Sequence, residues 1–539
     1  MKYRFQYSAD DPSDVYFKTQ ILGQTSANAY TQPNTSLYIK NLSEAKAFFE
    51  EKLNGLSQEA LIDLFLKVTE RLKFNEYMID DINDVYVTFE TMNNRGKSLS
   101  ILELLKNRLI YLSSLYAELK SDDVDADLAT KAEKAKDLRD TINNTWKTIY
   151  IFLGKSTSKK LSDDAFLRDH WMMYFKYDRK TSMPFKDELL SKTFTAKRLI
   201  KKELTIEAIK TYVDSLRESV VAWFNINCPQ ESDIDMEGKI WLTRLSRVGI
   251  GSFRPLLMAA YVKKQESAKL QDLLKACERF RFLVFRVTER RSNTSDSHFY
   301  GLAHDYYCDR KTFDDVVGDV QGQTNYWFSM SNFVNASVDR YKKREGFYSW
   351  SGLRYFLYEY ERSQVKDNVK KVNWDLFENN QKDKISIEHI YPQSPKDKYW
   401  TDRFVTDGDK ALTHSLGNLL LLSVAKNSGE QNYSFEKKKK TERNEKGEVI
   451  HNGYDTGSYS EIYVSQKEDW TPKRIIDRGK ELLTFFLEHW KIDYTFSEEE
   501  INKLLNISSA SYTASEALTL AEDPDWAKSA EEGEILANQ

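Results

Sequence analysis

Cysteine is scarce in this 539-residue sequence, and its three copies stand far apart at Cys228, Cys277 and Cys308. Because no CxxC pair occurs, the sequence predicts neither a disulfide framework nor a structural zinc site, which fits a reducing, cytoplasmic location. Apolar runs of membrane-spanning length are also absent, and the N-terminus has no signal-peptide core. We therefore expect no association with a membrane.

Proline and glycine are also few, with 9 and 20 copies, which favours long helices over turn-rich sheets. Hydrophobic residues make up 40% of the chain and charged residues 30%, as is typical of a soluble globular protein. The net charge of −4 gives no overall attraction for nucleic acid, so contacts with DNA must come from local basic patches. We predict a mainly α-helical protein with small α/β parts and roughly two to four domains.

The first predicted domain, residues 1–115, contains a strand, a loop and a helix in close succession. Val85–Glu90 alternates β-branched and aromatic residues, and Ser100 and Glu103 form a capping box in front of an apolar helix. Backbone N–H groups and the positive helix end at such a loop favour a phosphate. The candidate nucleotide-binding residues are Asn93, Arg95 and Gly96. A simple turn that needs glycine for a positive φ is the alternative.

The rest of the chain is predicted to form three further parts. Residues 116–345 read as a helical middle domain, because aromatic residues at helical spacing usually form core. Residues 346–500 change to shorter elements and end in a helix that begins at Thr471, with Pro472 in its first turn. Residues 501–539 are small and acidic, and we expect a disordered tail there.

One motif in residues 346–500 contains side chains of the kind that take part in catalysis. The sequence ISIEHIYPQS, residues 385–394, places a glutamate beside a histidine where an apolar strand ends before Pro392. Such a pair can hold a metal ion and act as a base, or it can be purely structural. Downstream, Asn418 opens an apolar strand, and Asn427 follows Lys426 nine residues later. The expected local order is a hairpin and then a helix.

In this order, EHIYPQ, LGN and KN resemble the HNH nuclease motif of the ββα-metal fold, in which such side chains surround one divalent ion. The resemblance implies that His389 is the general base that activates water and that Asn418 fixes the loop carrying it. It also implies that Glu388 and Asn427 are metal ligands. A neutral imidazole suits proton abstraction near pH 7, and oxygen ligands suit Mg²⁺ or Mn²⁺.

Lysines near this motif are candidate contacts to DNA phosphates. The run from Lys437 to Lys440 is usual for a solvated helix face, and beside a nuclease motif it is an equally plausible phosphate-contacting strip. The candidate phosphate contacts are Lys426, Lys437 and Lys438. His414 also lies close in sequence, and we expect an exposed histidine in a loop there.

A second resemblance lies near the N-terminus. The segment FETMNNRGKSLSILELLKN resembles the second conserved block of the ParB/sulfiredoxin-like NTPase domain of GmrSD-type restriction endonucleases. The matching positions are Phe89, Asn93, Gly96 and Leu99. The helical middle and the C-terminal motifs extend the likeness over roughly residues 1–490. The resemblance implies an endonuclease that cleaves foreign, typically phage, DNA with modified bases, and an N-terminal domain that hydrolyses nucleoside triphosphate.

One departure from that family is that its DGQQR motif occurs nowhere in the sequence. The ParB-like domain is therefore expected to be incomplete, either because the chain is truncated or because a partner chain supplies the missing block. The alternative function is a catalytically silent or partner-dependent DNA-binding subunit of a split restriction system. The same site acting on RNA or on unmodified DNA also remains open at this level.

Overall fold

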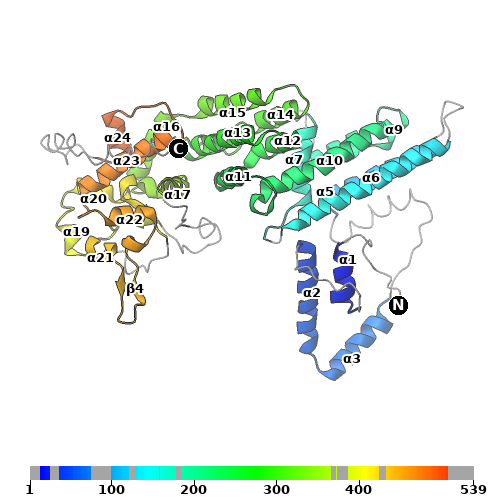
Figure 1. Cartoon of the computed structure of the whole chain (residues 1–539), viewed down its shortest axis with the longest axis horizontal. Helices are drawn as coiled ribbons and strands as arrows, with labels where there is room; N and C mark the ends of the chain where they lie inside the picture. Colours follow the sequence, from blue (N-terminus) through cyan, green and yellow to red (C-terminus); the bar gives the residue numbers. More distant parts are fainter. Residues whose placement is uncertain are drawn as a thin grey trace. The chain divides into compact units, whose positions relative to one another are not determined.

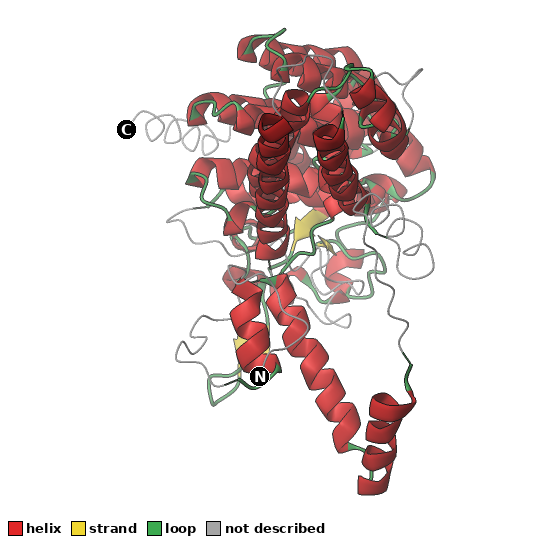
Figure 2. Ribbon diagram, turned by 90° about the vertical axis from the view of Figure 1, so that its right-hand side faces the viewer, coloured by secondary structure: helices red, strands yellow, loops and turns green. Residues whose placement is uncertain are grey.

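The structure, a computed structural model, describes most of the chain. The described residues are 12–24, 36–73, 99–119, 128–156, 158–177, 184–365, 372, 387–423 and 432–507. Within them helices predominate and strands are short, which confirms the mainly α-helical expectation (Figures 1 and 2). The chain divides into two compact units, one of Met1–Glu278 with Asn293–Gln321 and one of Arg279–Ser292 with Gly322–Gln539.

In its described residues, the first unit consists of helices and the turns that connect them. Its longer helices are α2 (Leu37–Asn54), α3 (Gln58–Leu66), α5 (Ile101–Glu118), α6 (Leu128–Lys155), α7 (Asp163–Tyr174), α10 (Ile206–Asn227), α11 (Met236–Val248), α12 (Arg254–Val262) and α14 (Asp296–Tyr307). Its shorter helices are α1 (Pro12–Tyr16), α8 (Phe185–Asp187) and α9 (Ala196–Ile200). Two further helices, α13 (Ser267–Phe280) and α15 (Phe313–Trp327), run across the unit boundaries in the sequence.

Helix α10 is central to the core of this unit. Its buried apolar residues recur at helical spacing and include Ile209, Val213, Leu216, Val220 and Phe224. The helix packs against α6, α7 and α12. Complete burial of each such side chain stabilises the fold by about 1.5–3 kcal/mol. Thr205 fixes where the helix begins, because its hydroxyl accepts the Ala208 N–H at 3.0 Å.

The start of α5 confirms the N-cap half of the predicted capping box, while the Glu103 side chain has a different partner. Ser100 is the N-cap residue, and its hydroxyl accepts the Glu103 N–H at 3.3 Å. The Glu103 carboxylate accepts a hydrogen bond from the Tyr150 hydroxyl at 3.2 Å, so it also ties α5 to α6. The predicted strand at Val85–Glu90 lies outside the described residues.

The two compact units differ from the predicted domain boundaries. Helix α5 passes residue 115 and packs on α6 and α7 within the first unit, so the core is continuous across that boundary. Residues 279–292 and 322–345, which we assigned to a helical middle domain, belong to the second unit. Their aromatic side chains form core with the C-terminal helices, which a linear reading of the sequence cannot show.

The second unit combines helices with two small sheets. Its further helices are α16 (Met330–Lys342), α17 (Leu353–Ser363), α19 (Lys398–Thr401), α20 (Asp407–Ala411), α21 (Phe435–Lys439), α22 (Tyr459–Ser465), α23 (Pro472–His489) and α24 (Glu498–Leu505). Three 3₁₀ turns near the site are η8 (Gly346–Ser349), η9 (Leu412–His414) and η10 (Leu416–Asn418). Strands β1 (Ile387–His389) and β2 (Leu419–Leu421) form one sheet, and β3 (Glu442–Arg443) and β4 (Val449–His451) form the other.

An aromatic cluster forms the core of the second unit. The Phe282 and Trp490 rings stack with their centroids 4.0 Å apart, and Phe356 and Phe486 pack around them. Because Phe282 lies about 200 residues before Trp490 in the chain, this cluster joins the two separated segments of the unit. It accounts for the placement of residues 279–292 with the C-terminal part.

The end of the described chain confirms one prediction and corrects another. Thr471 caps α23, with its hydroxyl accepting the Arg474 N–H at 3.4 Å, and Pro472 is the first helical residue as predicted. The predicted tail boundary at residue 501 is wrong, because it falls inside α24, whose Leu504 and Leu505 are buried. The residues from 508 onward lie outside the described part.

Gly417 lets η10 pack directly against the backbone of α23. A Cβ at this position would lie 1.8 Å from the Ile475 carbonyl oxygen and 2.7 Å from the Gly479 nitrogen. We expect Gly417→Ala to lower the free energy of unfolding by about 3 kcal/mol or more, because two backbones must separate. The matched control is Gly322→Ala on α15, where a Cβ meets no heavy atom within 4 Å. This control should be neutral or stabilising by about 0.5–1 kcal/mol.

Urea denaturation followed by tryptophan fluorescence measures both variants. Equal stability of Gly417→Ala and the unsubstituted protein would contradict the close packing of η10 on α23.

Within the described ranges, none of the helices is both long enough and apolar enough to cross a membrane.

Candidate active site

The acid–histidine pair lies on β1, in the buried sheet of the second unit. This strand pairs antiparallel with β2, so that Glu388 is opposite Leu420 and His389 is opposite Leu419. All six residues of the two strands are buried. Just beyond the strand, the Ile390 N–H donates to the Asn418 carbonyl at 3.1 Å. The sheet therefore brings His389 and Asn418, which are 29 positions apart in the sequence, close together.

Asn418 is buried and fixes the backbone that follows His389. Its side-chain oxygen accepts the Tyr391 N–H at 2.8 Å, and its amide nitrogen donates to the Tyr391 carbonyl at 2.9 Å. The same nitrogen donates to the Thr413 carbonyl at 2.8 Å, and the Trp470 indole N–H reaches the side-chain oxygen at 3.3 Å. The oxygen and the nitrogen of the Asn418 amide thus each have defined partners, and the loop after β1 is held in one position.

Arg478 holds the other side of this turn from α23. Its guanidinium is buried and donates to the carbonyls of Gly417 and Leu419 at 2.7 and 2.9 Å. These two carbonyls flank Asn418, so the residue is fixed through its backbone as well as its side chain. No spacing within the sequence predicts this contact between α23 and η10.

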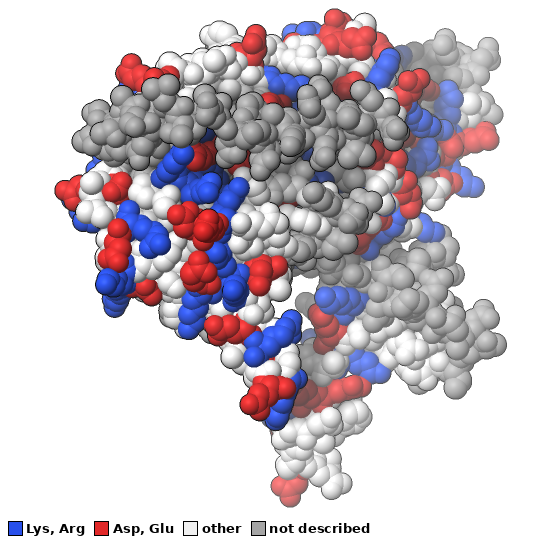
Figure 3. Space-filling model, turned by 60° about the vertical axis from the view of Figure 1, so that its left-hand side comes forward, with Lys and Arg blue, Asp and Glu red and all other residues white. Residues whose placement is uncertain are grey.

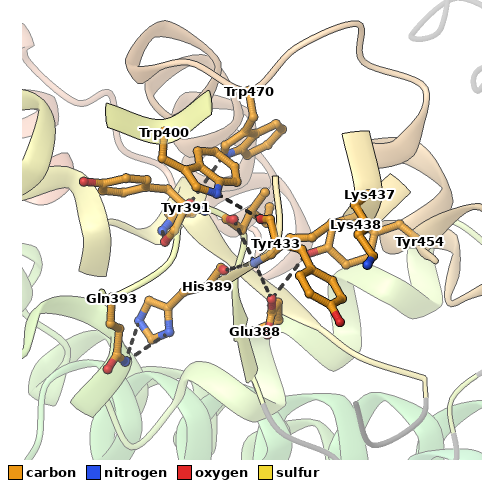
Figure 4. Close-up of polar contacts among 12 residues, drawn as sticks. Glu388, His389, Tyr391, Gln393, Trp400, Tyr433, Lys437, Lys438, Tyr454 and Trp470 are labelled. Carbon is orange, nitrogen blue, oxygen red and sulfur yellow. Dashed lines mark hydrogen bonds and ion pairs between the residues drawn. The ribbon is translucent and has the colours of Figure 1, made fainter. Parts of the chain in front are cut away.

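His389 is nearly enclosed, with 7% of its surface exposed. Its ring lies near the rings of Tyr348 on η8 and His414 on η9, with centroid distances of 4.6 and 5.0 Å. The side-chain nitrogen of Gln393 lies 3.2 Å from its Nδ1 and 3.3 Å from its Nε2 (Figure 4). Burial, followed by the charges of His414 and Lys438, lowers the pKa of His389 to about 3. The imidazole is therefore neutral at pH 7, and one of its ring nitrogens presents a lone pair.

His414 differs from the exposed loop histidine that we expected. It is half-buried at the end of η9, and its Nδ1 lies 3.0 Å from the Nε2 of His389. Burial lowers the pKa of His414 as well. The two rings meet because Asn418 holds the Thr413 carbonyl beside the loop that follows β1. No local sequence pattern signals this contact across 25 positions.

The structure corrects the role of Lys438. Only 3% of this residue is exposed, and its ammonium donates to Glu388 Oε1 at 2.7 Å. It also donates to the carbonyls of His389 and Ile390 at 3.0 and 3.1 Å (Figure 4). These three bonds use the N–H groups of the ammonium inside the protein, so the prediction of a phosphate contact is wrong for this lysine. Its role is to neutralise Glu388 and to hold the end of β1.

Glu388 is correspondingly enclosed, with 4% exposure. Besides Lys438, the buried Tyr454 hydroxyl reaches the same Oε1 at 3.4 Å. The carboxylate is a hard oxygen donor of the kind that Mg²⁺ binds, but an ammonium already balances its charge. Among the described residues, no three His, Cys, Asp or Glu side chains come together to hold a metal ion. The residues that the structure describes therefore do not by themselves make a metal site.

Three other groups of predicted site residues are placed differently. Lys437 is exposed beside Lys438, and its ammonium lies 3.9 Å from the centre of the Tyr433 ring, so it stays a candidate phosphate contact. Asn427 and Lys426 lie outside the described residues, between β2 and α21. The candidate nucleotide-binding residues, Asn93, Arg95 and Gly96, also lie outside them. The complete ββα-metal arrangement therefore stays a prediction.

Comparison with known proteins finds a family similar to the part of the chain that contains the candidate site. Residues 333–485 match the family model of the C-terminal domain of GmrSD restriction endonucleases. The matched residues contain β1, β2, α21 and the 3₁₀ turns around His389, so the candidate site lies in the part of the chain that is similar to this domain. The match covers less than half of the chain and does not reach the N-terminal part, where the ParB-like domain stays a prediction. No curated protein matches the chain.

Proposed function

We propose that this chain is a divalent-metal-dependent HNH-type endonuclease that cleaves foreign DNA, such as phage DNA with modified bases, in antiviral defence. The observation that carries the proposal is the neutral, enclosed His389 at the end of β1, fixed beside Asn418 in the part of the chain that is similar to a restriction endonuclease domain. A neutral imidazole has a ring nitrogen with a lone pair, which a general base needs in order to take a proton from water.

In the proposed reaction, His389 accepts a proton from a water molecule at a ring nitrogen. The oxygen of that water forms a bond to phosphorus while the bond between phosphorus and the 3′ oxygen breaks. The leaving 3′ oxygen takes a proton from solvent. Asn418 acts in this scheme as a positioning residue, because it holds the backbone after His389 and does not face the reacting atoms.

A divalent ion, Mg²⁺ or Mn²⁺, would supply stabilisation of negative charge on the phosphate and the leaving oxygen. The proposed ligands are Glu388 and Asn427, as the resemblance to the HNH motif implies. Since Lys438 neutralises Glu388 in the structure, an ion bound there competes with this ammonium. We therefore expect metal affinity to depend on the charge of residue 388.

Glu388→Gln tests the metal ligand. The substitution keeps an oxygen that accepts from Lys438 but removes the negative charge. We expect the Mg²⁺ concentration for half-maximal cleavage to rise at least about tenfold, and Mn²⁺ binding measured by calorimetry to weaken equally. The matched control is Glu436→Gln on α21, an exposed glutamate that pairs with Lys439 at 3.2 Å and should leave both values unchanged.

If Glu388→Gln binds Mn²⁺ as tightly as the unsubstituted protein, Glu388 is only the buried partner of Lys438. Metal dependence would then need other ligands.

DNA binding in this proposal uses local contacts. On the face that Figure 3 shows, basic and acidic side chains are interspersed and form no single basic field. The exposed Lys437 is one proposed phosphate contact, and Lys426 is another. This pattern agrees with the near-neutral charge of the chain and favours recognition through a few defined residues.

A second candidate function rests on the absence of a DGQQR motif in the sequence. In that case the chain is a partner-dependent DNA-binding subunit of a split restriction system, and nucleoside triphosphate binding at Asn93, Arg95 and Gly96 requires the partner. Metal-dependent turnover by the purified chain alone would exclude this alternative.

A further inference from the structure

Helices α2 and α3 expose apolar side chains along their length. The first half of α2 is anchored to the first unit, because Ile39 is buried and the Lys46 ammonium donates to the Gln20 carbonyl at 2.6 Å. Residues 47–73, all of which the structure describes, contain no buried side chain. Apolar groups in such number are unfavourable in water, so this segment presents a surface that another molecule or segment covers.

The exposed apolar residues of α3 follow the spacing of a buried helix face. They occupy positions i, i+3, i+4, i+7 and i+11 of the segment formed by α3, its continuation η2 (Lys67–Arg71) and the next residue, namely Leu61, Leu64, Phe65, Val68 and Leu72. This is the pattern of a helix that packs against another helix. On α2, Leu42, Ala45, Phe49 and Leu53 recur at spacings of three and four residues. Both helices therefore carry an apolar stripe.

The size of this face matches a stable protein–protein interface. Eleven large apolar side chains between residues 38 and 72 are 36–65% exposed, and Phe49 and Phe65 are the most exposed of them. Because each is roughly half exposed and has a total surface of about 150–200 Å², the face presents on the order of 800 Å². Each partner buries about this area in an interface of standard size, whereas the largest apolar patch on a typical monomer is about 300–600 Å².

The charges of the same segment favour a second copy of the chain over DNA or a lipid surface. A helix that binds nucleic acid or anionic lipid carries an excess of Lys and Arg. Residues 37–73 instead contain six Lys or Arg and six Asp or Glu, so their net charge is zero. Three ion pairs join residues four apart within one helix, namely Lys40–Glu44, Lys46–Glu50 and Lys67–Asp63. Two copies of such a neutral segment do not repel each other.

We propose that α2 and α3 form the interface of a homodimer, in which their apolar stripes pack against the same stripes of a second copy of this chain. The contact is isologous, because both copies use the same surface. Apolar interfaces with few charges at their centre are typical of homodimers. This inference does not depend on the proposed nuclease function, since it concerns a surface of the first unit.

Sedimentation velocity of the purified full chain measures its oligomeric state over a range of protein concentrations. We expect a dimer with a Kd in the micromolar range or lower, as is usual for an interface of this size. Phe65→Glu puts a carboxylate into the α3 stripe and should raise this Kd at least about hundredfold. Met236→Glu, the matched control on α11, adds the same charge at a residue that is 69% exposed and should leave the Kd unchanged.

Phe49→Glu tests the stripe of α2 in the same way. Phe49 and Phe65 are both exposed in the single chain, so neither substitution opens a core, and thermal unfolding checks that the variants are folded. We expect both variants to be folded monomers at concentrations at which the unsubstituted protein is a dimer. If one of them does not fold, the other decides.

Cross-linking identifies the surface directly. Protein labelled with ¹⁵N is mixed with unlabelled protein and left to exchange, and a lysine-reactive reagent then joins neighbouring lysines. We expect cross-links that join Lys52 or Lys67 of a labelled peptide to Lys52 or Lys67 of an unlabelled one. Such a pair can come only from two copies of the chain.

Three results would overturn the proposal. A monomer at protein concentrations of about 100 μM, well above the Kd of such an interface, would mean that a different protein covers the face. A dimer that persists in both Phe49→Glu and Phe65→Glu would place the interface on another surface. Cross-links from Lys52 and Lys67 only to lysines of the same copy would show that the chain covers this face with its own segments.

Discussion

His389→Ala is expected to lower kcat for DNA cleavage by about 10²–10⁴-fold, the usual contribution of a general base. The physical reason is that the substitution removes a neutral, enclosed imidazole at the end of β1. The fold should survive, because Asn418, Lys438 and Arg478 hold the surrounding backbone through bonds that do not use this ring.

To test this prediction, the cleavage rate and the thermal stability are measured on the same samples. Cleavage of cytosine-modified DNA gives kcat and KM, and thermal unfolding shows whether the variant is folded. His298→Ala provides the control, as an exposed histidine in the first unit. A folded His389→Ala that cleaves as fast as the unsubstituted protein would show that another group is the base.

Lys438→Met is expected to lower the free energy of unfolding by about 3–5 kcal/mol. Methionine fills a similar volume, but it leaves the carboxylate of Glu388 buried without its cation and removes one donor from each of two backbone carbonyls. An uncompensated buried charge costs more than the loss of a surface ion pair, because no water replaces the missing partner. We expect cleavage to fall as well, since Lys438 holds the carbonyl of His389.

The adjacent lysine makes a matched control for this prediction. Lys437→Met changes an exposed residue on the same short helix, whose contact is the Tyr433 ring, and should cost less than about 1 kcal/mol. The double variant Lys438→Met with Glu388→Gln should recover part of the lost stability, because it removes the charge that Lys438→Met leaves unpaired. If Lys438→Met and Lys437→Met are equally stable in urea denaturation, Lys438 has no internal role.

Local features of the fold were predictable where the signal is itself local. Ser100 and Thr471 begin helices as N-caps, because a short polar side chain can bond to an N–H three residues ahead in any tertiary context. Two short apolar strands, each with a polar residue at its end, predicted a hairpin, and the resemblance to the HNH motif implied that Asn418 fixes the loop after His389. These inferences need little knowledge of how distant segments pack.

The wrong predictions depended on tertiary packing. A run of lysines resembles a solvated face, and Lys438 is nevertheless buried because it lies one helical turn after Phe435, which is also buried. The spacing of Phe435 and Lys438 in the sequence therefore indicates that both side chains face the same side of the helix. His414 contacts His389 through packing of η8, η9 and the loop after β1, which no spacing in the sequence records. The division into two units similarly reflects aromatic contacts between segments far apart in the chain.

The most direct test of the central claim is cleavage of plain and cytosine-modified phage DNA by the purified chain, with Mg²⁺ or Mn²⁺ and with or without GTP or ATP. His389→Ala is assayed beside it under the same conditions. The account predicts metal-dependent cleavage, strongest on modified DNA, that is lost in the variant. Absence of cleavage on every DNA, under conditions in which the chain is folded and binds metal, would contradict an autonomous endonuclease and favour a partner-dependent subunit.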